Sequence, residues 1–326
     1  MINLVYNEMV KVNGKRRLVV VALIIGVLIS VFTYAQFRQA EENQRRFGSV
    51  DWRVALEQRI ASWENRMNST RTDEASKAEL KIRIEQHQYY LDYNVNPSEP
   101  GAPTFVRGFV ENGIQLLLPL LMMIVAADLV SSEHSAGTVK VLLTRPVRRW
   151  RILLSKYLAL LLSVSIIILL FALLSTVISG SIFGFQGWTA PVITGFAVVG
   201  EALDATRAHL VPQWQYILME LGLAWYVSVV VATITFMLSV LVRTTAAVMG
   251  IMLACLIAGT ILNSMVASWE SAKYLFMVNL ELIDYLEDAA PPVEGMSLGF
   301  SMLVLLVWGA SALTVAFVSF TRRDVY

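Results

Sequence analysis

The sequence predicts an all-α integral membrane protein with six transmembrane helices. Hydrophobic residues make up 56% of the 326 residues and the mean hydropathy is +0.60, which is more apolar surface than an ordinary soluble domain carries. Six apolar runs also reach the ~20 residues that a helix needs to cross a ~30 Å hydrocarbon core. These predicted spans are residues 18–35, 109–130, 157–183, 215–242, 247–268 and 298–320.

Residues 1–17 predict an amphipathic interfacial helix ahead of the first span. The apolar side chains of Ile2, Val5, Met9 and Val12 share one helical face, and Gly14 is placed to end the helix. Such a helix lies in the membrane interface. The first apolar run is longer than the 7–15 residues of a signal-peptide core and lacks a convincing cleavage site, so we expect it to be retained.

The distribution of lysine and arginine predicts that both termini are cytoplasmic in a multi-pass protein of the plasma membrane. Basic residues in short loops stay on the cytoplasmic side. With cytoplasmic termini, the outer short loops hold only Arg207 and Lys273. The inner side then holds Lys11, Lys15, Arg16, Arg17, Lys140, Arg145, Arg148, Arg149, Arg151, Lys156, Arg243, Arg322 and Arg323.

Three outer segments separate the spans. Residues 36–108 predict an extracytoplasmic helical domain, because two apolar stripes at helical spacing indicate a two-helix hairpin. The stripes are Trp52, Leu56, Ile60, Trp63 and Met67, and Leu80, Ile84, His87 and Leu91. Residues 184–214 predict an outer loop. Residues 269–297 are acidic, and we interpret them as a solvated loop or short helix, with attraction of cations as the alternative.

Several kinds of chemistry have no support in the sequence. A G-x-x-x-x-G-K-[ST] phosphate-binding loop does not occur, and the three histidines are scattered. A single cysteine, Cys255, excludes an intrachain disulfide and cannot complete a typical zinc cluster. We therefore expect no enzyme activity and no cofactor or metal bound by this chain. The net charge of +1 predicts no nucleic-acid partner.

Ionisable residues within spans usually mark pathways, because a charge in lipid is costly. Here none falls at a predicted midplane. Glu111 and Glu220 lie about a turn inside the outer ends of their spans, and Asp128 lies near the inner end of the second span. We expect each to reach interfacial water, which argues against a proton- or ion-driven carrier.

Two groups of residues are candidates for a translocation path or a dimer contact. In the second predicted span, Glu111 and Gln115 share a face, and Pro119 frees a backbone carbonyl. The fifth span carries small residues four apart that let another helix approach closely. These are Ala246, Gly250, Ala254 and Ala258. Packing within one subunit explains that stripe equally well.

Residues 131–156 form a highly specified stretch between two spans. Ser131 or Ser132 is placed to cap a short helix with Glu133 in its first turn. Pro146 disfavours helical geometry at Arg145 and suits the start of a second helix over residues 146–156, which then bends into the third span. Membrane topology explains the arginines of this stretch, but not its glycine, its threonine or the Arg-Pro break.

The motif E-x-x-x-G-T-x-K-x-L-L-x-R-P-V-x-R-x-x-I-L-x-S-K, which ends at Lys156, resembles the type-2 permeases of ABC transporters. Its most specific positions are Glu133, Gly137, Thr138, Lys140, Leu143, Arg145 and Pro146. The resemblance extends to the six spans and the amphipathic N-terminal helix. The large segment 36–108 departs from the shortest members of the family.

The resemblance implies the permease subunit of an ATP-driven exporter. Such a subunit pairs with a second copy or a paralogue and docks cytoplasmic ABC ATPase subunits, which bind the ATP and magnesium. Residues 133–144 would be the coupling helix that receives motion from the ATPase. The second and fifth spans would line the pathway, which adds Asn263 to the candidates named above.

Two other functions remain open. A membrane sensor or structural protein would use the hairpin within 36–108 to bind a partner. An autonomous secondary transporter would work without nucleotide. For an exporter, the apolar spans suit amphiphilic cargo such as peptides, lipids or hydrophobic drugs, and sodium is also compatible.

Overall fold

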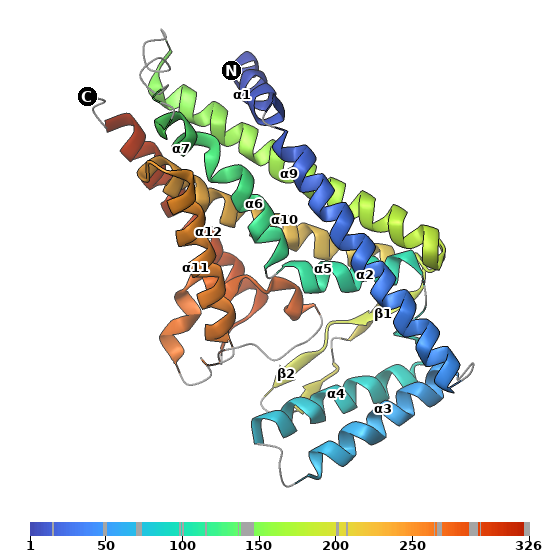
Figure 1. Cartoon of the computed structure of the whole chain (residues 1–326). Coiled ribbons are helices and arrows are strands. Elements are labelled where there is room, and N and C mark those ends of the chain that lie inside the picture. Colours follow the sequence, from blue (N-terminus) through green and yellow to red (C-terminus); the bar gives the residue numbers. More distant parts are fainter. Residues whose placement is uncertain are drawn as a thin grey trace.

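The computed structural model is a bundle of long helices with a smaller helical hairpin at one end (Figure 1). It describes residues 1–14, 16–47, 51–69, 74–97, 99, 101–114, 116–135, 137, 147–199, 202–206, 208–263, 265, 269–286, 293 and 295–322. Its α-helices are α1 (Ile2–Gly14), α2 (Arg17–Phe47), α3 (Trp52–Met67), α4 (Glu74–Asp92), α5 (Ala102–Ile114), α6 (Leu117–Ala126), α7 (Asp128–Ser135), α9 (Arg149–Phe183), α10 (Gln213–Leu241), α11 (Thr245–Asn263) and α12 (Leu298–Arg322).

Five of these helices, α2, α9, α10, α11 and α12, are long and apolar enough to cross a membrane. The consecutive helices α5 and α6–α7 pass the same test only as a bent pair, which gives up to six spans. The prediction of a membrane protein built from apolar helices is therefore confirmed. Gly14 ends α1 as expected.

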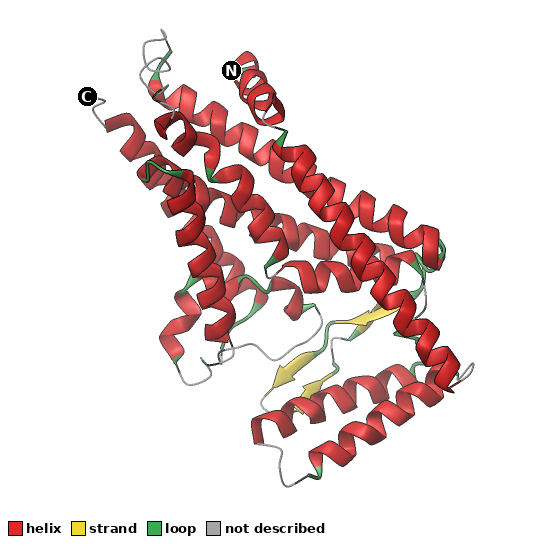
Figure 2. Cartoon of the chain, viewed as in Figure 1, coloured by secondary structure: helices red, strands yellow, loops and turns green. Residues whose placement is uncertain are grey.

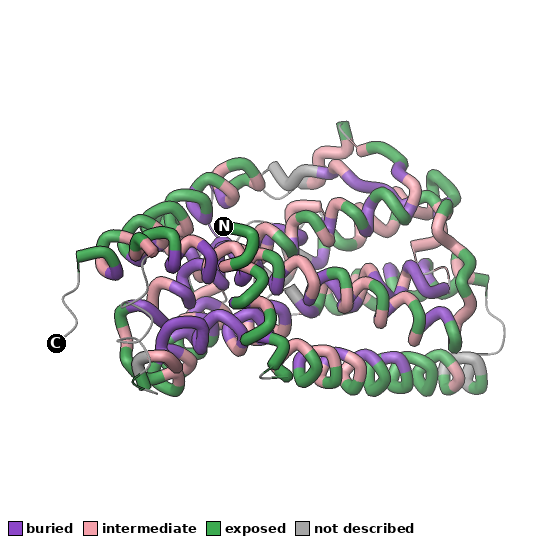
Figure 3. The backbone as a smooth tube through the Cα atoms, turned by 90° about the horizontal axis from the view of Figure 1, so that it is seen from above, coloured by how far each residue is buried: buried purple, intermediate pink, exposed green. Residues whose placement is uncertain are grey.

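The two chain termini lie at the same end of the bundle, and the α3–α4 hairpin lies at the opposite end (Figure 1). We call these the terminal end and the hairpin end. Helix α10 packs against α5, α6, α9 and α12, and its Val227, Val231 and Phe236 side chains are completely buried. Exposed residues follow the outer sides of the helices (Figure 3). The core thus surrounds α10.

The second predicted span, 109–130, is not one straight helix. Helix α5 begins at Ala102, and the axis bends by 66° between Gly113 and Leu117 before α6 begins. Pro119 gives the physical reason. In a continuous helix it has no N–H to donate to the carbonyl of residue 115, and its ring clashes with that carbonyl, whereas proline fits the first turn of a new helix. The apolar run had predicted a span without this break.

The third span also differs from the expectation. Helix α9 runs without interruption from Arg149 to Phe183, so residues 149–156 are its first turns and not a separate helix that bends into a span beginning at 157. Thirty-five residues correspond to a length of about 50 Å, which exceeds the ~30 Å hydrocarbon core. Helix α9 therefore extends beyond the hydrocarbon region.

The hairpin of α3 and α4 is found where the two apolar stripes indicated it, although the segment boundaries differ. Helix α2 continues to Phe47, well past residue 35, and α5 begins before residue 108. Asp51 caps α3 by accepting a hydrogen bond from the backbone N–H of Arg53. The described outer region therefore consists of α3, α4 and the chain that returns to α5.

The expected loop at 184–214 contains short strands in its described residues, drawn in yellow in Figure 2. Strand β1 (Pro191–Thr194) pairs antiparallel with β4 (His209–Pro212), and β2 (Ala197–Val199) pairs with β3 (Ala202–Asp204). Side chains from this ribbon and from the end of α4 form a small separate core that includes Val95, Ile193 and Phe196. The ribbon therefore joins the hairpin to the bundle.

The described residues 269–286 of the acidic segment 269–297 are packed into the protein, which corrects our interpretation of this part as solvated. The described part contains the 3-10 helices η2 (Glu270–Tyr274), η3 (Phe276–Asn279) and η4 (Leu282–Tyr285). Phe276, Leu282 and Ile283 are buried in the main core. The apolar residues between the acids explain this packing, because they fill the space beside α10, α11 and α12.

Candidate functional site

A buried charge cluster joins three helices at the terminal end. The Nζ atom of Lys156, in the second turn of α9, donates to Glu8 Oε2 at 2.8 Å and to Glu133 Oε1 at 2.8 Å. It also donates to the carbonyl oxygen of Leu129 at 3.2 Å. The Lys156 side chain is only 1% exposed. One ammonium group thus bridges α9, α1 and α7.

A second lysine balances the charge of this cluster. Lys11 Nζ donates to Glu8 Oε1 at 2.9 Å and to Glu133 Oε1 at 3.2 Å, from a half-exposed position on α1. Two positive and two negative groups therefore meet, as a buried ion pair requires. We call Glu8, Lys11, Glu133 and Lys156 the four-residue cluster.

The pKa shifts of Glu8 and Lys11 favour the charged forms of these two residues. Burial by itself would raise the pKa of Glu8, but Lys156 and Lys11 outweigh burial and hold that pKa below its ordinary value. Burial would likewise lower the pKa of Lys11, and the carboxylates of Glu8 and Glu133 raise it above its ordinary value instead. Mutual attraction therefore outweighs the cost of desolvation at both residues.

A neighbouring polar network attaches α7 to further helices. Asp128, the first residue of α7, forms a salt bridge with Arg17 of α2 and accepts a hydrogen bond from Thr245 of α11 at 3.2 Å. The hydroxyl of Ser239, near the end of α10, accepts the backbone N–H groups of Val130 and Ser131 at 3.1 and 3.0 Å. Helix α7 is therefore tied to α1, α2, α9, α10 and α11.

Helix α7 differs from the short helix expected after the second span. Ser131 and Ser132 lie inside it and bond back to the carbonyls of Ala127 and Asp128, so neither is an N-cap, and Glu133 lies in its last turn. Beyond α7, Gly137 has a φ of +68°, the conformation in which glycine commonly ends helices. The other predicted coupling residues, Thr138, Lys140, Leu143, Arg145 and Pro146, lie outside the described residues.

The candidate pathway residues are not brought together into one site. Glu111 pairs with Arg107 at 3.3 Å within α5, and Pro119 lies in the first turn of α6. Asn263 ends α11, and Gln115 lies outside the described residues. Ala246, Gly250 and Ala254 face outward from α11, with Ala258 partly covered on the same stripe.

A group of ionisable residues at the hairpin end was not predicted as a cluster. Arg107 donates to the carbonyl of Pro97 at 3.1 Å and interacts electrostatically with Glu111 and Glu220. Glu220 is completely buried, so the expectation that it reaches interfacial water was wrong. Burial and the nearby carboxylates of Glu281 and Glu111 raise the pKa of Asp284, on η4, to about 7.

The sequence analysis identified Glu133 as a site residue, but not Glu8, Lys11 or Lys156, which complete the four-residue cluster. Glu8 carried a signal, because it is the one acid between Val5 and Val12 on the buried face of α1. A lone carboxylate on an apolar helix face needs a partner. Lys156 is the last residue of the motif, but its position in the sequence does not indicate which carboxylates it contacts. Within the described ranges, His, Cys, Asp and Glu side chains form no group of three or more that could hold a metal.

The long apolar helices, joined by salt bridges and hydrogen bonds at the terminal end, define a multi-pass membrane protein. Residues 79–326 match the family described as "Protein of unknown function (DUF2705)", and the chain therefore belongs to that family. It is similar to the uncharacterized protein YhcI of Bacillus subtilis (strain 168), with 29% identity over all of this chain and 99% of the relative. It is also similar to the uncharacterized membrane protein YdbK of the same organism, with 23% identity over 65% of this chain and 79% of the relative.

Proposed function

We propose that the chain is the transmembrane permease subunit of an ATP-driven ABC exporter, located in the plasma membrane with both termini in the cytoplasm. It would pair with a second copy or a paralogue and dock separate ABC ATPase subunits, which bind ATP and magnesium. The chain itself would catalyse no reaction. The observation that carries the proposal is the position of Glu133, the first residue of the motif, in the four-residue cluster.

The cluster gives the proposed coupling element a defined mechanical role. Glu133 stands in the last turn of α7, directly before the motif residues that would contact the ATPase. Its carboxylate is held by Lys156 at 2.8 Å and by Lys11 at 3.2 Å. Because separating these buried charges is costly, a push on α7 has to carry α1 and the start of α9 with it.

The polar network beside the four-residue cluster supports this role. Motion that enters at α7 would reach α2 and α11 through Arg17, Asp128 and Thr245, and α10 through Ser239. The outward-facing small residues of α11 would then be available to the second permease copy. Motion of α7 would thus reach α2, α10 and α11 through direct side-chain contacts.

Purification from native membranes tests the proposal. A tagged full-length chain should retain an ABC ATPase subunit, and the complex should hydrolyse ATP in a manner inhibited by vanadate. Replacing Glu133 with Trp should disrupt the cluster and lower ATPase retention or stimulated hydrolysis at least ~10-fold. The matched control, Glu64→Trp on the exposed side of α3, should change neither. A chain that never retains an ATPase would refute the proposal.

A second candidate function is a membrane sensor or assembly protein. It is favoured by the α3–α4 hairpin, which projects from the bundle and shares a small core with the strand ribbon (Figure 1). Under this alternative the purified protein would bind a partner through the hairpin and no ATPase would be retained. Gradient-driven transport in vesicles without nucleotide would indicate an autonomous secondary transporter instead.

A further inference from the structure

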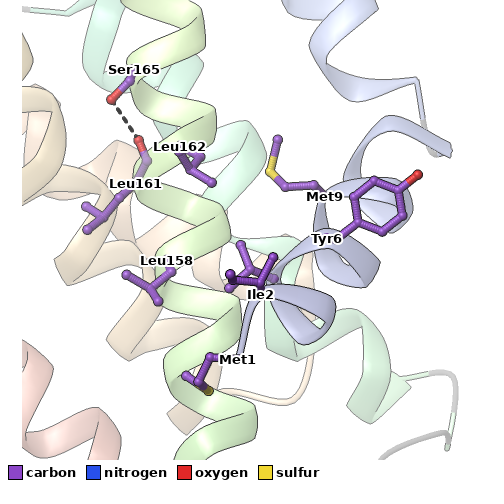
Figure 4. Close-up of a pocket in the computed structure, with 9 residues that line it drawn as sticks. Met1, Ile2, Tyr6, Met9, Leu158, Leu161, Leu162 and Ser165 are labelled. Carbon is purple, nitrogen blue, oxygen red and sulfur yellow. Dashed lines mark hydrogen bonds between the residues drawn. The ribbon is translucent and has the colours of Figure 1, made fainter.

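An apolar groove lies between α1 and the first half of α9, on the outside of the bundle. Its volume is about 570 Å³, within the range of about 300–1,000 Å³ typical of small-molecule pockets. Met9 and Leu162 extend toward one another across it (Figure 4). Ile2, Tyr6 and Leu158 contribute further apolar surface.

The groove offers little to a polar ligand. The hydroxyl of Ser165, which lines it, already donates to the carbonyl of Leu161 at 3.0 Å and accepts the indole N–H of Trp225 at 3.0 Å. Two of the apolar side chains on α1 are strongly exposed, Ile2 at 85% and Tyr6 at 68%. Apolar exposure of this extent on an amphipathic helix is typical of contact with lipid.

The charges beside the groove have one sign. Helices α1 and α9 together contain a single acidic residue, Glu8, and its carboxylate is buried against Lys156 and Lys11. Arg151 is exposed and lies over the Trp150 ring at 5.4 Å. Tryptophan and arginine together mark the headgroup level of a membrane.

Arg151 is also aligned with the groove. Residues 151, 158 and 162 are separated by seven and four positions, so they follow one face of α9. Seven residues of helix correspond to a rise of about 10 Å, which places Arg151 between the groove and the terminal end. An acyl chain in the groove would therefore bring its phosphate toward the Arg151 guanidinium.

We propose that this groove binds one anionic phospholipid from the leaflet at the terminal end, with an acyl chain between α1 and α9 and its phosphate at Arg151. Such a lipid would fix α1 against α9 beside the four-residue cluster. The proposal depends on α1 lying in the membrane interface and not on transport or on an ATPase partner. Its failure is therefore distinguishable from failure of the proposed function.

Native mass spectrometry of the full-length protein in detergent tests the proposal. The probes are phosphatidylglycerol and phosphatidylcholine with identical acyl chains. We expect one phosphatidylglycerol to be retained about fivefold more tightly than phosphatidylcholine, the effect of one arginine at an anionic headgroup. Arg151→Gln should abolish that preference and leave phosphatidylcholine binding unchanged. Arg322→Gln, an exposed arginine at the same end, should preserve it.

A groove-filling variant tests the acyl-chain site separately. Leu162→Trp should weaken retention of both lipids at least ~10-fold, whereas Leu173→Trp, at an exposed apolar position further along α9, should not. Equal retention of the two lipids by the unmodified protein would overturn the proposal. Equal losses of lipid retention in Leu162→Trp and Leu173→Trp would also overturn it. So would a Leu162→Trp protein that keeps its lipid but no longer forms a dimer, because the groove would then be a contact between two copies of the chain. If Leu162→Trp does not fold, the Arg151 comparison decides alone.

Discussion

Lys156 Nζ lies 2.8 Å from Glu8 Oε2 although the two residues are 148 positions apart. The same atom lies 2.8 Å from Glu133 Oε1, so one buried ammonium group holds together α1, α7 and α9. The contact joins segments that the sequence presents as independent. Its strength is therefore the first property to measure.

Replacing Lys156 with Met should destabilise the protein. Within the four-residue cluster, the carboxylates of Glu8 and Glu133 would then contact one lysine, Lys11, in place of two. The expected loss is about 3 kcal/mol, the lower end of the range for breaking a buried pair, because Lys11 still contacts both acids. Thermal unfolding in detergent measures this loss. Lys81→Met, at an exposed position on α4, is the control and should leave the midpoint within about 1 °C.

Gly137 should be required for its backbone conformation and not for its small size. A Cβ there would meet no atom within 4 Å, but φ is +68°. Valine at positive φ costs about 1–3 kcal/mol, whereas asparagine tolerates it. If the chain docks the ABC ATPase that we propose, Gly137→Val should lower stimulated hydrolysis about fivefold or more and Gly137→Asn should stay near the unmodified rate. Equal loss in both variants would contradict this explanation.

Asp284 should make stability depend on pH. Its pKa of about 7 in the folded protein exceeds the ordinary value of about 3.9, so between these values the folded state holds a proton that the unfolded chain releases. The stabilising contribution of Asp284 is therefore fully present below about pH 4, and this contribution is lost as the pH rises through 7. Unfolding midpoints should fall by at least about 2 °C from pH 5 to pH 8.

The variant Asp284→Asn isolates this effect, because an amide stays neutral over the whole range. The decline between pH 5 and pH 8 should become shallower than in the unmodified protein. Glu57→Gln, at an exposed position on α3, should retain the full decline. A pH dependence that is identical in all three proteins would exclude Asp284 as its source.

Two glycines of α11 should respond in opposite ways to alanine. A Cβ at Gly259 would lie 2.8 Å from the carbonyl oxygen of Met277, whereas a Cβ at Gly250 would meet nothing within 4 Å. Gly259→Ala should therefore force α11 away from η3 and destabilise the protein by about 1–3 kcal/mol. Gly250→Ala should be neutral or stabilising by up to about 1 kcal/mol, because alanine favours a helix. Unfolding midpoints of the two variants compare these effects directly.

The long elements could be predicted because each carries its own periodic signal. Helices α10 and α12 end within two residues of the apolar runs that indicated them. The hairpin was visible in its two stripes. By contrast, strands of three or four residues, such as β1, depend on their pairing partners for stability. Their sequence resembles that of any mildly apolar loop.

The site was less predictable than the helices. The motif indicated Glu133 and Gly137, but sequence spacing does not determine which distant carboxylates Lys156 contacts. The acids of residues 269–286 suggested exposure, and only packing against α10, α11 and α12 explains why Phe276 and Ile283 are buried. Pro119 was recognised as a disturbance, yet a proline can kink a helix or end it, and the neighbouring packing decides between these outcomes.

The bend between α5 and α6 divides the second span into two bodies with different attachments. Helix α5 is held at the hairpin end, where Arg107 bonds to the carbonyl of Pro97, while α6 leads into α7 and its anchors at the terminal end. A straight helix would carry an axial displacement from one membrane surface to the other. With a 66° change of direction, an axial displacement of α6 is not directed along the axis of α5, so no single straight helix links the two membrane surfaces in this segment.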